Sequence, residues 1–402
     1  MKIVDVRTYL LTSRWVDHPY LPVELHSTAL IQVLTDKELS GLGETILGYF
    51  APEVVPPLLN FYKPLLLGED PEKINALWEK LYASSIYWGR TGAALSVLSG
   101  IEMALWDLKA KAAGVPLYQL LGGLARESLP LYYSGGPSLW PVQKTVDMCQ
   151  YYVDLGYRAI KFSTGYYLKE GPPEIPSGWK IKSVPKARLG EYEGEKLGAV
   201  RQALGPEIDI IIDGHQSGIA NPYSVADAIR VLDAIAPSGV LFFEEPLPYT
   251  DPIGYAELRR HQKVPIGGGE SLSGVHEFRQ FLDLGALDVV QPEVTFIGGI
   301  SSTYEVIKQA ASQNLRSALH CGGTFGPGLA ASIHLSFAST TSLILEHVVS
   351  NSDVQKEIML EPVVLHNGAI LPPSAPGLGL RISDDLLAKY AYIPGTGEVP
   401  PL

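Results

Sequence analysis

The sequence contains few cysteines and no long apolar run. Its 402 residues include only two cysteines, Cys149 and Cys321. Two cysteines cannot form a zinc site alone and do not indicate a disulfide framework. No run of eighteen apolar residues occurs, which argues against a transmembrane helix. The first residues, MKIVDVRTYLL, are mixed in polarity and unlike a signal peptide. We therefore expect a protein of the reducing cytoplasm.

Basic residues are also scarce relative to acidic ones. The chain has 31 lysines and arginines against 43 aspartates and glutamates, which gives a net charge of -12. Nucleic acids and anionic membranes favour clustered positive charge, so neither is an expected partner. A content of 46% apolar and 18% charged residues is typical of a globular protein. The length exceeds one ordinary core, which indicates two domains or a barrel with an attached cap.

The first part of the chain predicts an α+β domain over residues 1–125. Two strand-like segments, IVDVRTYLL and STALIQVLTD, precede a glycine-rich bend expected at Gly41 and Gly43. A long apolar helix should end at Gly114, because glycine after the last turn and proline shortly beyond it stop helices. The expected helices are Val54–Leu67, Pro71–Tyr82 and Ala93–Ala113.

From about Leu129 the chain alternates short apolar runs with helical patterns. Continuous apolar runs are typical of buried parallel strands, and eight such βα units close a TIM-type barrel. We assign the barrel to residues 126–360 and expect residues 361–402 to return to the N-terminal region. The eight runs are LPLYYS, YRAIKF, IDIIID, VLFFEE, VPIGGG, LDVVQP, RSALH and SLILEH.

Ionisable residues stand at the ends of seven consecutive strands, from the second to the eighth. The last positions of barrel strands point into the mouth, where active sites of this fold assemble. Five carboxylates at one mouth would repel each other unless cations neutralise them. The strand-end residues are Lys161, Asp213, Glu244, Glu270, Glu293, His320 and Glu346.

Three of these carboxylates predict a metal site. Asp213, Glu244 and Glu270 end the neighbouring third, fourth and fifth strands. Three adjacent carboxylates with open positions suit a hard divalent cation such as Mg²⁺. The competing interpretation is that one or two of them are salt-bridged structural acids. Glu245 follows Glu244 directly, so its side chain should point the opposite way, toward the layer between strands and helices.

One interval between strand-end residues is unusually long. From Asp213 to Glu346 these residues follow one another at intervals of 23 to 31, whereas Lys161 and Asp213 are 52 residues apart. A long loop after a barrel strand lies on the catalytic face, where it can act as a lid or select the substrate. The segments expected to read the substrate are this insertion, with Tyr166, Tyr167 and Trp179, and the stretches Trp15–Tyr20 and Gly48–Phe50.

The ordered set of motifs resembles the enolase superfamily in its mandelate racemase branch. The resemblance rests on IIDGHQ, LFFEEPLP, PIGGGES, VVQPEVTFIGG and the lone His320, together with GLGETILGYFAPE and GIEMALWDLKAKAAGVPLYQLLGG. It implies an α/β fold, a modified (β/α)₇β TIM barrel, with an α+β capping domain formed by the N-terminal region and the C-terminal tail. It further implies one Mg²⁺ per subunit, a homo-oligomer, and removal of the proton α to a carboxylate to form a metal-stabilised enediolate.

The resemblance implies that His320 is the base. A carboxylate bonded to one ring nitrogen fixes the tautomer and raises the basicity of the other nitrogen. Glu293 stands where the family pattern usually has aspartate. Its longer side chain can either reach His320 or turn toward the substrate, and the sequence leaves both open. A histidine with a purely structural role is the competing interpretation.

Three further residues match family positions with implied roles. Lys161 matches the first lysine of a Lys-x-Lys motif whose second lysine is replaced by Ser163, so Lys161 is implied to be an electrophile near the substrate carboxylate. A role of Lys161 as base or acid, or as a purely structural lysine, remains an alternative. His215 resembles the histidine that protonates the departing β-hydroxyl in galactonate- and mannonate-type dehydratases. Glu346 matches a glutamate that hydrogen-bonds the substrate carboxylate, which requires a protonated carboxyl that crowding should favour.

These features together predict an Mg²⁺-dependent dehydratase that converts a sugar acid to a 2-keto-3-deoxy acid. A racemase or epimerase and a lactone cycloisomerase use the same proton abstraction and remain alternatives. A non-catalytic binding protein on the same fold is a remote alternative, because such a protein would be expected to have lost metal ligands.

Overall fold

A computed structural model describes most of the chain. The described residues are 1–15, 24–135, 142–164, 168–169, 181–182, 185–218, 221–261, 263–348 and 352–397. Much of the expected substrate-reading surface lies outside them, namely residues 16–20 and Tyr166, Tyr167 and Trp179.

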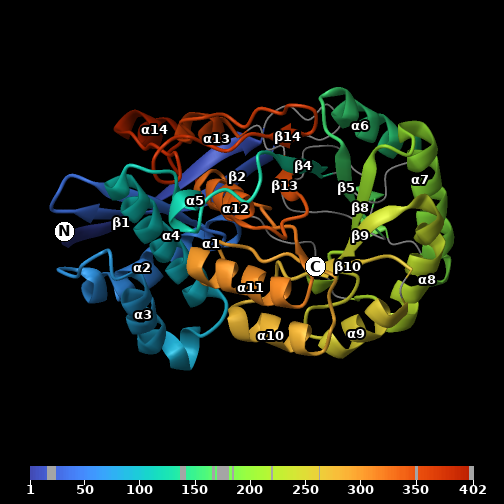
Figure 1. Ribbon diagram of the computed structural model, residues 1–402, viewed down its shortest axis with the longest axis horizontal. Helices are drawn as coiled ribbons and strands as arrows, with labels where there is room; N and C mark the ends of the chain where they lie inside the picture. The colour runs from blue at the N-terminus through green and yellow to red at the C-terminus, as the bar shows by residue number, and fades with distance from the viewer. Residues whose placement is uncertain are drawn as a thin grey trace.

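The N-terminal region forms an antiparallel sheet covered by helices, as predicted. Its strands follow the order β1-β2-β3, with β1 spanning Ile3–Trp15, β2 Glu24–Thr35 and β3 Ser40–Thr45. Figure 1 shows this sheet and its helices at one end of the molecule. The helices are α1 (Leu47–Phe50), α2 (Val55–Leu66), α3 (Ile74–Gly89) and α4 (Ala93–Ala113).

The bend predicted at Gly41 and Gly43 is wrong, because both glycines lie inside β3. A Cβ atom on Gly43 would stand 1.9 Å from the carbonyl oxygen of Gly100, and one on Gly41 equally close to that of Ala104. Glycine is therefore needed here for the close approach of β3 to α4 and not for a turn.

Helix α4 has the bounds that the sequence predicts. Gly114 ends it in the left-handed conformation, with φ 69°, and its N–H donates to the carbonyls of Ala110 and Lys111. The helix is apolar nearly all round because it is buried between the cap sheet and the barrel. Helix α3 begins later than expected, at Ile74, because Asp70 accepts hydrogen bonds from the backbone N–H groups of Glu72 and Lys73 in a preceding turn.

Eight parallel strands form the second sheet, one for each predicted apolar run. Their order is β12-β11-β10-β9-β8-β5-β4-β13, and a parallel bridge between Ser317 and Ser342 joins the two ends of this series. The strands are β4 (Leu129–Ser134), β5 (Ala159–Ser163), β8 (Asp209–Asp213), β9 (Val240–Glu244), β10 (Ile266–Gly268), β11 (Val289–Val290), β12 (Arg316–Ser317) and β13 (Leu345–Val348).

Seven helices alternate with these strands, which confirms the (β/α)₇β barrel. They lie around the outside of the sheet (Figure 1). In chain order they are α6 (Val142–Asp154), α7 (Leu189–Leu204), α8 (Val225–Ile235), α9 (Pro252–His261), α10 (Val275–Asp283), α11 (Ile300–Ser312) and α12 (Pro327–Ala338). Buried side chains such as Tyr132, Phe242 and Val289 fill the barrel. The carboxyl ends of all eight strands therefore meet at one mouth.

The C-terminal segment contacts both the barrel and the cap. Strand β14 (Ala369–Ile370) pairs with β4, and helices α13 (Asp353–Ile358) and α14 (Asp384–Lys389) flank it. The N–H of Thr12 in the cap sheet donates to the carbonyl of Tyr390 over 3.0 Å. The exact domain limits at residues 125 and 360 stay a prediction.

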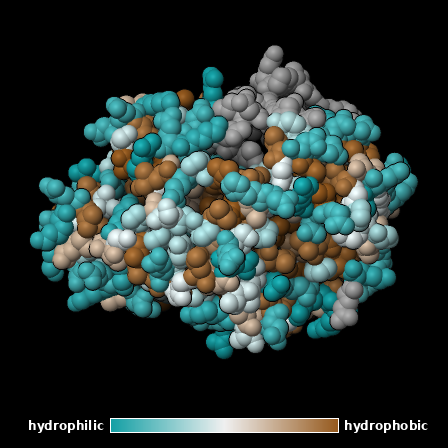
Figure 2. All heavy atoms as spheres, turned by 45° about the horizontal axis from the view of Figure 1, so that its top comes forward, coloured by the Kyte–Doolittle hydropathy of each residue, from teal (hydrophilic) through white to brown (hydrophobic). Residues whose placement is uncertain are grey.

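The surface mixes polar and apolar side chains, as the face in Figure 2 shows. Across the described ranges, none of the helices combines the length and the apolar character that crossing a membrane requires. Both cysteines are buried and carry free thiols, in agreement with the expected absence of a disulfide framework.

The packing of β3 on α4 predicts a contrast between two glycine substitutions. Gly43→Ala should lower the free energy of unfolding by about 2 kcal/mol or more, because its Cβ collides with backbone that cannot move aside. Gly198→Ala, in an exposed part of α7 with no atom within 4 Å of the added Cβ, should raise it by up to about 1 kcal/mol. Urea unfolding measures both, and equal stabilities would contradict the prediction.

Candidate functional site

Asp213, Glu244 and Glu270 come together at the mouth of the barrel. Asp213 and Glu244 are the last residues of β8 and β9 and are paired in register, and Glu270 follows the end of β10 by two residues. One carboxylate oxygen of each lies within 4.8 Å of the other two. The spacing of the three oxygens is that of a set of ligands able to hold one metal ion.

The electrostatics of this cluster favour a bound cation. Burial raises the pKa of Glu270 to about 8, and burial with the nearby Asp213 carboxylate holds the pKa of Glu244 well above its usual range. Oε2 of Glu244 is buried and accepts no hydrogen bond from the described residues. Carboxylates arranged in this way are costly without a positive partner, and their oxygens are the ligands that hard divalent cations prefer.

Lys161 supplies the positive charge that the described residues place beside the cluster. Its Nζ lies 2.7 Å from Glu244, 2.9 Å from Glu346 and 3.1 Å from Asp213. Burial alone would lower the pKa of this lysine, which is 3% exposed, but the surrounding carboxylates hold the pKa well above its usual range. A lysine in this state is a charged hydrogen-bond donor and is poorly suited to accept a proton.

His320 and Glu293 form a hydrogen-bonded pair beside the cluster. Nδ1 of His320 lies 2.8 Å from Oε2 of Glu293, and Nε2 lies 3.3 Å from Oε2 of Glu270. Oε1 of Glu293 accepts the N–H and hydroxyl of Thr295. Of the two orientations left open by the sequence, Glu293 therefore takes the one that reaches His320. Its carboxylate favours the proton on Nδ1 and leaves Nε2 as the basic atom.

Glu346 is close to Lys161 and His320, but the expectation that crowding keeps its carboxyl protonated is wrong. Burial alone would raise the pKa of Glu346, yet Lys161, His320 and the backbone N–H of Cys321 lower it to about 2. The N–H donates to Oε2 over 2.7 Å. Glu346 is thus a carboxylate that needs donors, and it balances the charge of Lys161.

His215 is in contact with the carboxylate of Asp213. Its Nε2 is 3.1 Å from Oδ2 of Asp213, and its backbone N–H donates to Oδ1. The side chain is 48% exposed, against 14% for His320. The backbone of His215 has a φ of 45°, an uncommon conformation for a residue with a side chain. The two histidines therefore differ in access to solvent and in their carboxylate partners.

Glu245 lies outside the metal cluster, as its position in the chain predicts. Its Oε1 accepts hydrogen bonds from the hydroxyls of Ser217 and Ser271, over 3.0 and 3.1 Å. These serines stand on the loops after β8 and β10, so Glu245 ties the loop of His215 to the loop of Glu270. Burial raises the pKa of Glu245 to about 7.

Sequence reasoning missed two residues of the site, Ser134 and Tyr132. Ser134 ends β4 and hydrogen-bonds Glu346, and the ring of Tyr132 lies 5.6 Å from Nζ of Lys161. The strand-end rule that located the ionisable residues would also have found Ser134. Tyr49 of α1 packs against Gly323, three residues after His320, which brings the expected Gly48–Phe50 segment to the mouth.

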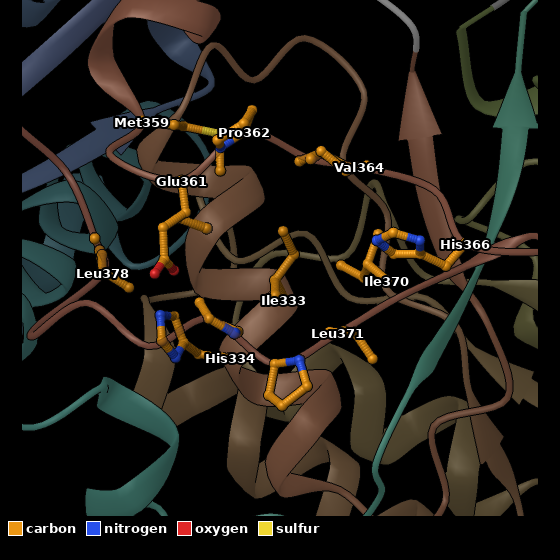
Figure 3. Close-up of a pocket in the computed structure, with 15 residues that line it drawn as sticks. Ile333, His334, Met359, Glu361, Pro362, Val364, His366, Ile370, Leu371 and Leu378 are labelled. Atoms are coloured by element: carbon orange, nitrogen blue, oxygen red, sulfur yellow. The ribbon is translucent and has the colours of Figure 1, made fainter.

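A separate cavity with a volume of about 220 Å³ lies between α12 and the C-terminal segment (Figure 3). Its lining is mainly apolar and includes Ile333, Met359 and Leu371, with His334 and Glu361 at one side. None of the cluster residues described above lines it. The cavity is therefore separate from the carboxylate cluster at the mouth of the barrel.

Comparisons with known proteins match both parts of the chain. The family model described as "Enolase C-terminal domain-like" matches residues 144–386. The model described as "Mandelate racemase / muconate lactonizing enzyme, N-terminal domain" matches residues 9–122. The second model covers most of the cap, and the first covers the barrel from α6 onward.

Individual relatives extend over nearly the whole chain. A D-galactonate dehydratase from Xanthomonas euvesicatoria pv. vesicatoria is 31% identical over 100% of this chain and 96% of its own. A D-galactarolactone cycloisomerase from Agrobacterium fabrum is 29% identical over 97% of this chain and 99% of its own. The crystal structure of a member of the enolase superfamily from Polaromonas sp. JS666 superposes with a TM-score of 0.83 at 28% identity, covering 99% and 100% of the two chains.

The charge balance at the mouth predicts that a cation can replace the lysine. Lys161→Met should destabilise the metal-free protein by roughly 3–5 kcal/mol, because it leaves buried carboxylates unpaired. An added divalent cation should restore part of this loss in urea unfolding.

Lys196→Met is the matched control for this substitution. Lys196 is also fully buried, and it pairs over 2.8 Å with Glu193, which is not one of the cluster carboxylates. That variant should lose stability without recovering it when the cation is added. Equal recovery in both variants would show that the cation acts elsewhere.

Proposed function

We propose that this chain, which belongs to the mandelate racemase and muconate lactonizing enzyme family of the enolase superfamily, dehydrates a sugar acid to a 2-keto-3-deoxy acid with one bound Mg²⁺. The observation that carries the proposal is the presence of two histidines, His320 and His215, at one carboxylate cluster. A dehydration needs both a base for the α-proton and an acid for the β-hydroxyl.

Mg²⁺ would be held by Asp213, Glu244 and Glu270, whose oxygens can reach a common point. A divalent cation at this position stabilises the negative charge that develops on the substrate carboxylate when the α-proton is removed. Lys161 can donate a hydrogen bond to the same substrate carboxylate, because its Nζ is already directed at this cluster and stays charged. The substrate acid would thus meet a cation and a lysine at its carboxylate end.

His320 is the base in this proposal. Nδ1 is engaged by Glu293, so Nε2 is the atom that takes the α-proton. The nearby carboxylates raise the pKa of His320 well above its usual range, against the effect of burial. A cation on Glu270 would offset part of this negative charge and favour the neutral imidazole that a base requires. Glu293 then stabilises the imidazolium after proton transfer.

His215 is the acid that completes the elimination. Hydroxide is a poor leaving group, so a proton must reach the β-oxygen as the bond to carbon breaks. The protonated imidazole of His215 donates this proton and becomes neutral, water departs, and the resulting enol converts to the 2-keto-3-deoxy acid. The partial exposure of His215 supports this role, because the acid must reach a substituent that lies one carbon away from the reacting α-carbon.

The relative named D-galactonate dehydratase supports the choice of a sugar acid as the substrate class. The relative named D-galactarolactone cycloisomerase favours one alternative, in which the same α-proton is removed and a ring oxygen departs. The engagement of Lys161 with three carboxylates argues against a second base on the opposite face, as a racemase needs. The products distinguish these reactions, because only dehydration of an open-chain acid releases a 2-keto acid with one water less.

The two histidine roles predict different effects of two substitutions. His320→Asn should abolish both product formation and exchange of the substrate α-proton with deuterium in D₂O. His215→Asn should lower the dehydration rate by roughly 10²–10⁴-fold, the usual contribution of an acid catalyst, while α-proton exchange continues. A library of sugar acids, assayed for 2-keto acid and by NMR for exchange, measures both rates.

His366→Asn is a matched control, because His366 is exposed on the C-terminal segment. It should leave both rates unchanged. Undiminished dehydration in His215→Asn, or undiminished exchange in His320→Asn, would contradict the assigned roles.

Metal dependence is tested with neighbouring glutamates. Mg²⁺ at 100 times its dissociation constant should stabilise the wild type by about 2.7 kcal/mol in thermal unfolding, and a chelator should stop turnover. Glu244→Gln should lose most of this stabilisation, whereas Glu245→Gln should keep it, because Glu245 lies outside the cluster. The reverse result would mean that the wrong glutamate of the pair has been assigned to the metal.

A further inference from the structure

Two barrel helices begin without an N-cap side chain of their own. Helix α11 follows Gly299 and α12 follows Gly326, and neither glycine offers a side-chain acceptor. Helix α8, in contrast, is capped by its own Ser224. The first N–H groups of a helix require acceptors when they are buried. Helices α11 and α12 must therefore obtain these acceptors from another element.

The missing acceptors are carboxylates of the cap. Glu102 on α4 accepts the N–H groups of Ile300, over 2.7 Å, and Ser301, over 3.0 Å. Glu44 on β3 does the same at the start of α12, where its donors are Phe325 (2.7 Å), Gly326 (3.3 Å) and Gly328 (3.0 Å). Both glutamates are only 1% exposed. Helix α4 is in contact with α11, and β3 is in contact with α12.

Helix α11 follows the loop that carries Glu293, and α4 holds this loop at further points. The carbonyl of Thr295, whose N–H and hydroxyl bind Glu293, accepts a hydrogen bond from Ser96 over 2.9 Å. The N–H of Gly298 donates to Ser99 over 2.8 Å. Ser96, Ser99 and Glu102 are spaced by three residues and therefore share one face of α4. This face is a polar stripe on a helix whose other buried residues are mostly apolar.

Helix α12 follows the loop that carries His320. At one end of this loop the N–H of Cys321 donates to Glu346, and at the other end Glu44 binds the first turn of α12. Between them, a Cβ on Gly322 would lie 2.6 Å from Nε2 of His320, so the loop passes directly against the imidazole. Any shift of the start of α12 would therefore be transmitted to His320 over a short, closely packed segment.

Both cap glutamates are costly groups to bury, which argues against the interpretation that they only hold the cap on the barrel. Burial raises the pKa of Glu44, and it raises that of Glu102 to about 7, although the backbone N–H groups oppose the shift. Apolar contacts could join the cap to the barrel without this cost. Carboxylates instead provide short, directional, charge-assisted hydrogen bonds, which fix geometry.

We propose that Glu44 and Glu102 are positioning residues for the His320–Glu293 pair. From the cap, they hold the N-termini of α12 and α11 and thereby set the two loops on which the pair stands. The proposal rests on the proposed function in one respect, namely that His320 removes the α-proton. It makes the cap a part of the base machinery in addition to a cover over the mouth.

The test compares Glu44→Gln and Glu102→Gln with the matched control Asp107→Asn. Asp107 is also fully buried on α4 and accepts the N–H groups of Leu42 and Leu378, but it touches neither loop of the pair. Measured at saturating Mg²⁺, kcat of the two glutamate variants should fall roughly ten- to a hundred-fold, as for a small misplacement of a catalytic group. KM should change by less than about two-fold.

The isotope effect separates positioning from loss of folded protein. With α-deuterated substrate, the isotope effect on kcat should rise in both glutamate variants, because slower proton abstraction becomes more rate-limiting. Asp107→Asn should lower the unfolding temperature by a similar amount and leave the isotope effect at the wild-type value. An unchanged isotope effect in the glutamate variants, or an equal rise in Asp107→Asn, overturns the proposal.

Two additional measurements keep the test decisive. Thr28→Val removes only the hydroxyl that donates to Glu44 over 2.7 Å, so it should show the same change in smaller measure if Glu44→Gln fails to fold. If the wild type epimerises or cycloisomerises its substrate instead, the isotope effect is measured on that reaction, which begins with the same proton. If the wild type exchanges no α-proton at all, the proposed function fails, and amide hydrogen exchange then tests the positioning role by itself. The backbone amides of residues 320–328 should exchange faster in Glu44→Gln than in Asp107→Asn. Equal exchange rates overturn the inference.

Discussion

Asp213, Glu244, Glu270 and Glu346 share a small volume at the carboxyl ends of the barrel strands, where every ionised carboxylate raises the cost of ionising the next. Lys161 is the buried cation in their midst, and it contacts three of the four. One lysine cannot neutralise this set, so the arrangement calls for a further positive charge. The proposed metal site and the charged state of the lysine both follow from this one imbalance.

The two histidines of the site differ in burial and in their contacts with the surrounding carboxylates. His320 is buried, and Glu293 engages one of its ring nitrogens, so its orientation and tautomer are set by the protein. His215 is half exposed, and its Nε2 lies 3.1 Å from Oδ2 of Asp213. A base that must meet one carbon atom benefits from a fixed position, whereas an acid that follows a departing group benefits from access. This difference underlies the proposed division of labour between them.

The cap and the barrel form the site jointly. Tyr49 of the cap lies against Gly323, three residues after His320, and cap carboxylates provide the acceptors at the start of two barrel helices. The glycines of β3 serve the same end, because they let the strand that carries Glu44 lie directly on α4. Hydrogen bonds that cross the boundary between the two parts therefore connect residues of the cap to the loops that carry Glu293 and His320.

Local sequence pattern was sufficient for the architecture and for the identity of most site residues. Eight apolar runs predicted eight strands, and the residue at or near each strand end predicted which side chains meet, because parallel strands share one carboxyl edge. Pattern alone did not predict that Lys161 and His320 lower the pKa of Glu346, that Glu293 reaches His320, or that Glu44 binds the first turn of a helix 281 to 284 residues further along the chain. Periodicity reports on neighbours within a few residues, whereas a pKa and a hydrogen bond depend on the distances and burial that packing of distant segments creates. The sequence by itself determined which groups are present and on which strands they stand; the tertiary structure decided their charges, their partners and their division of roles.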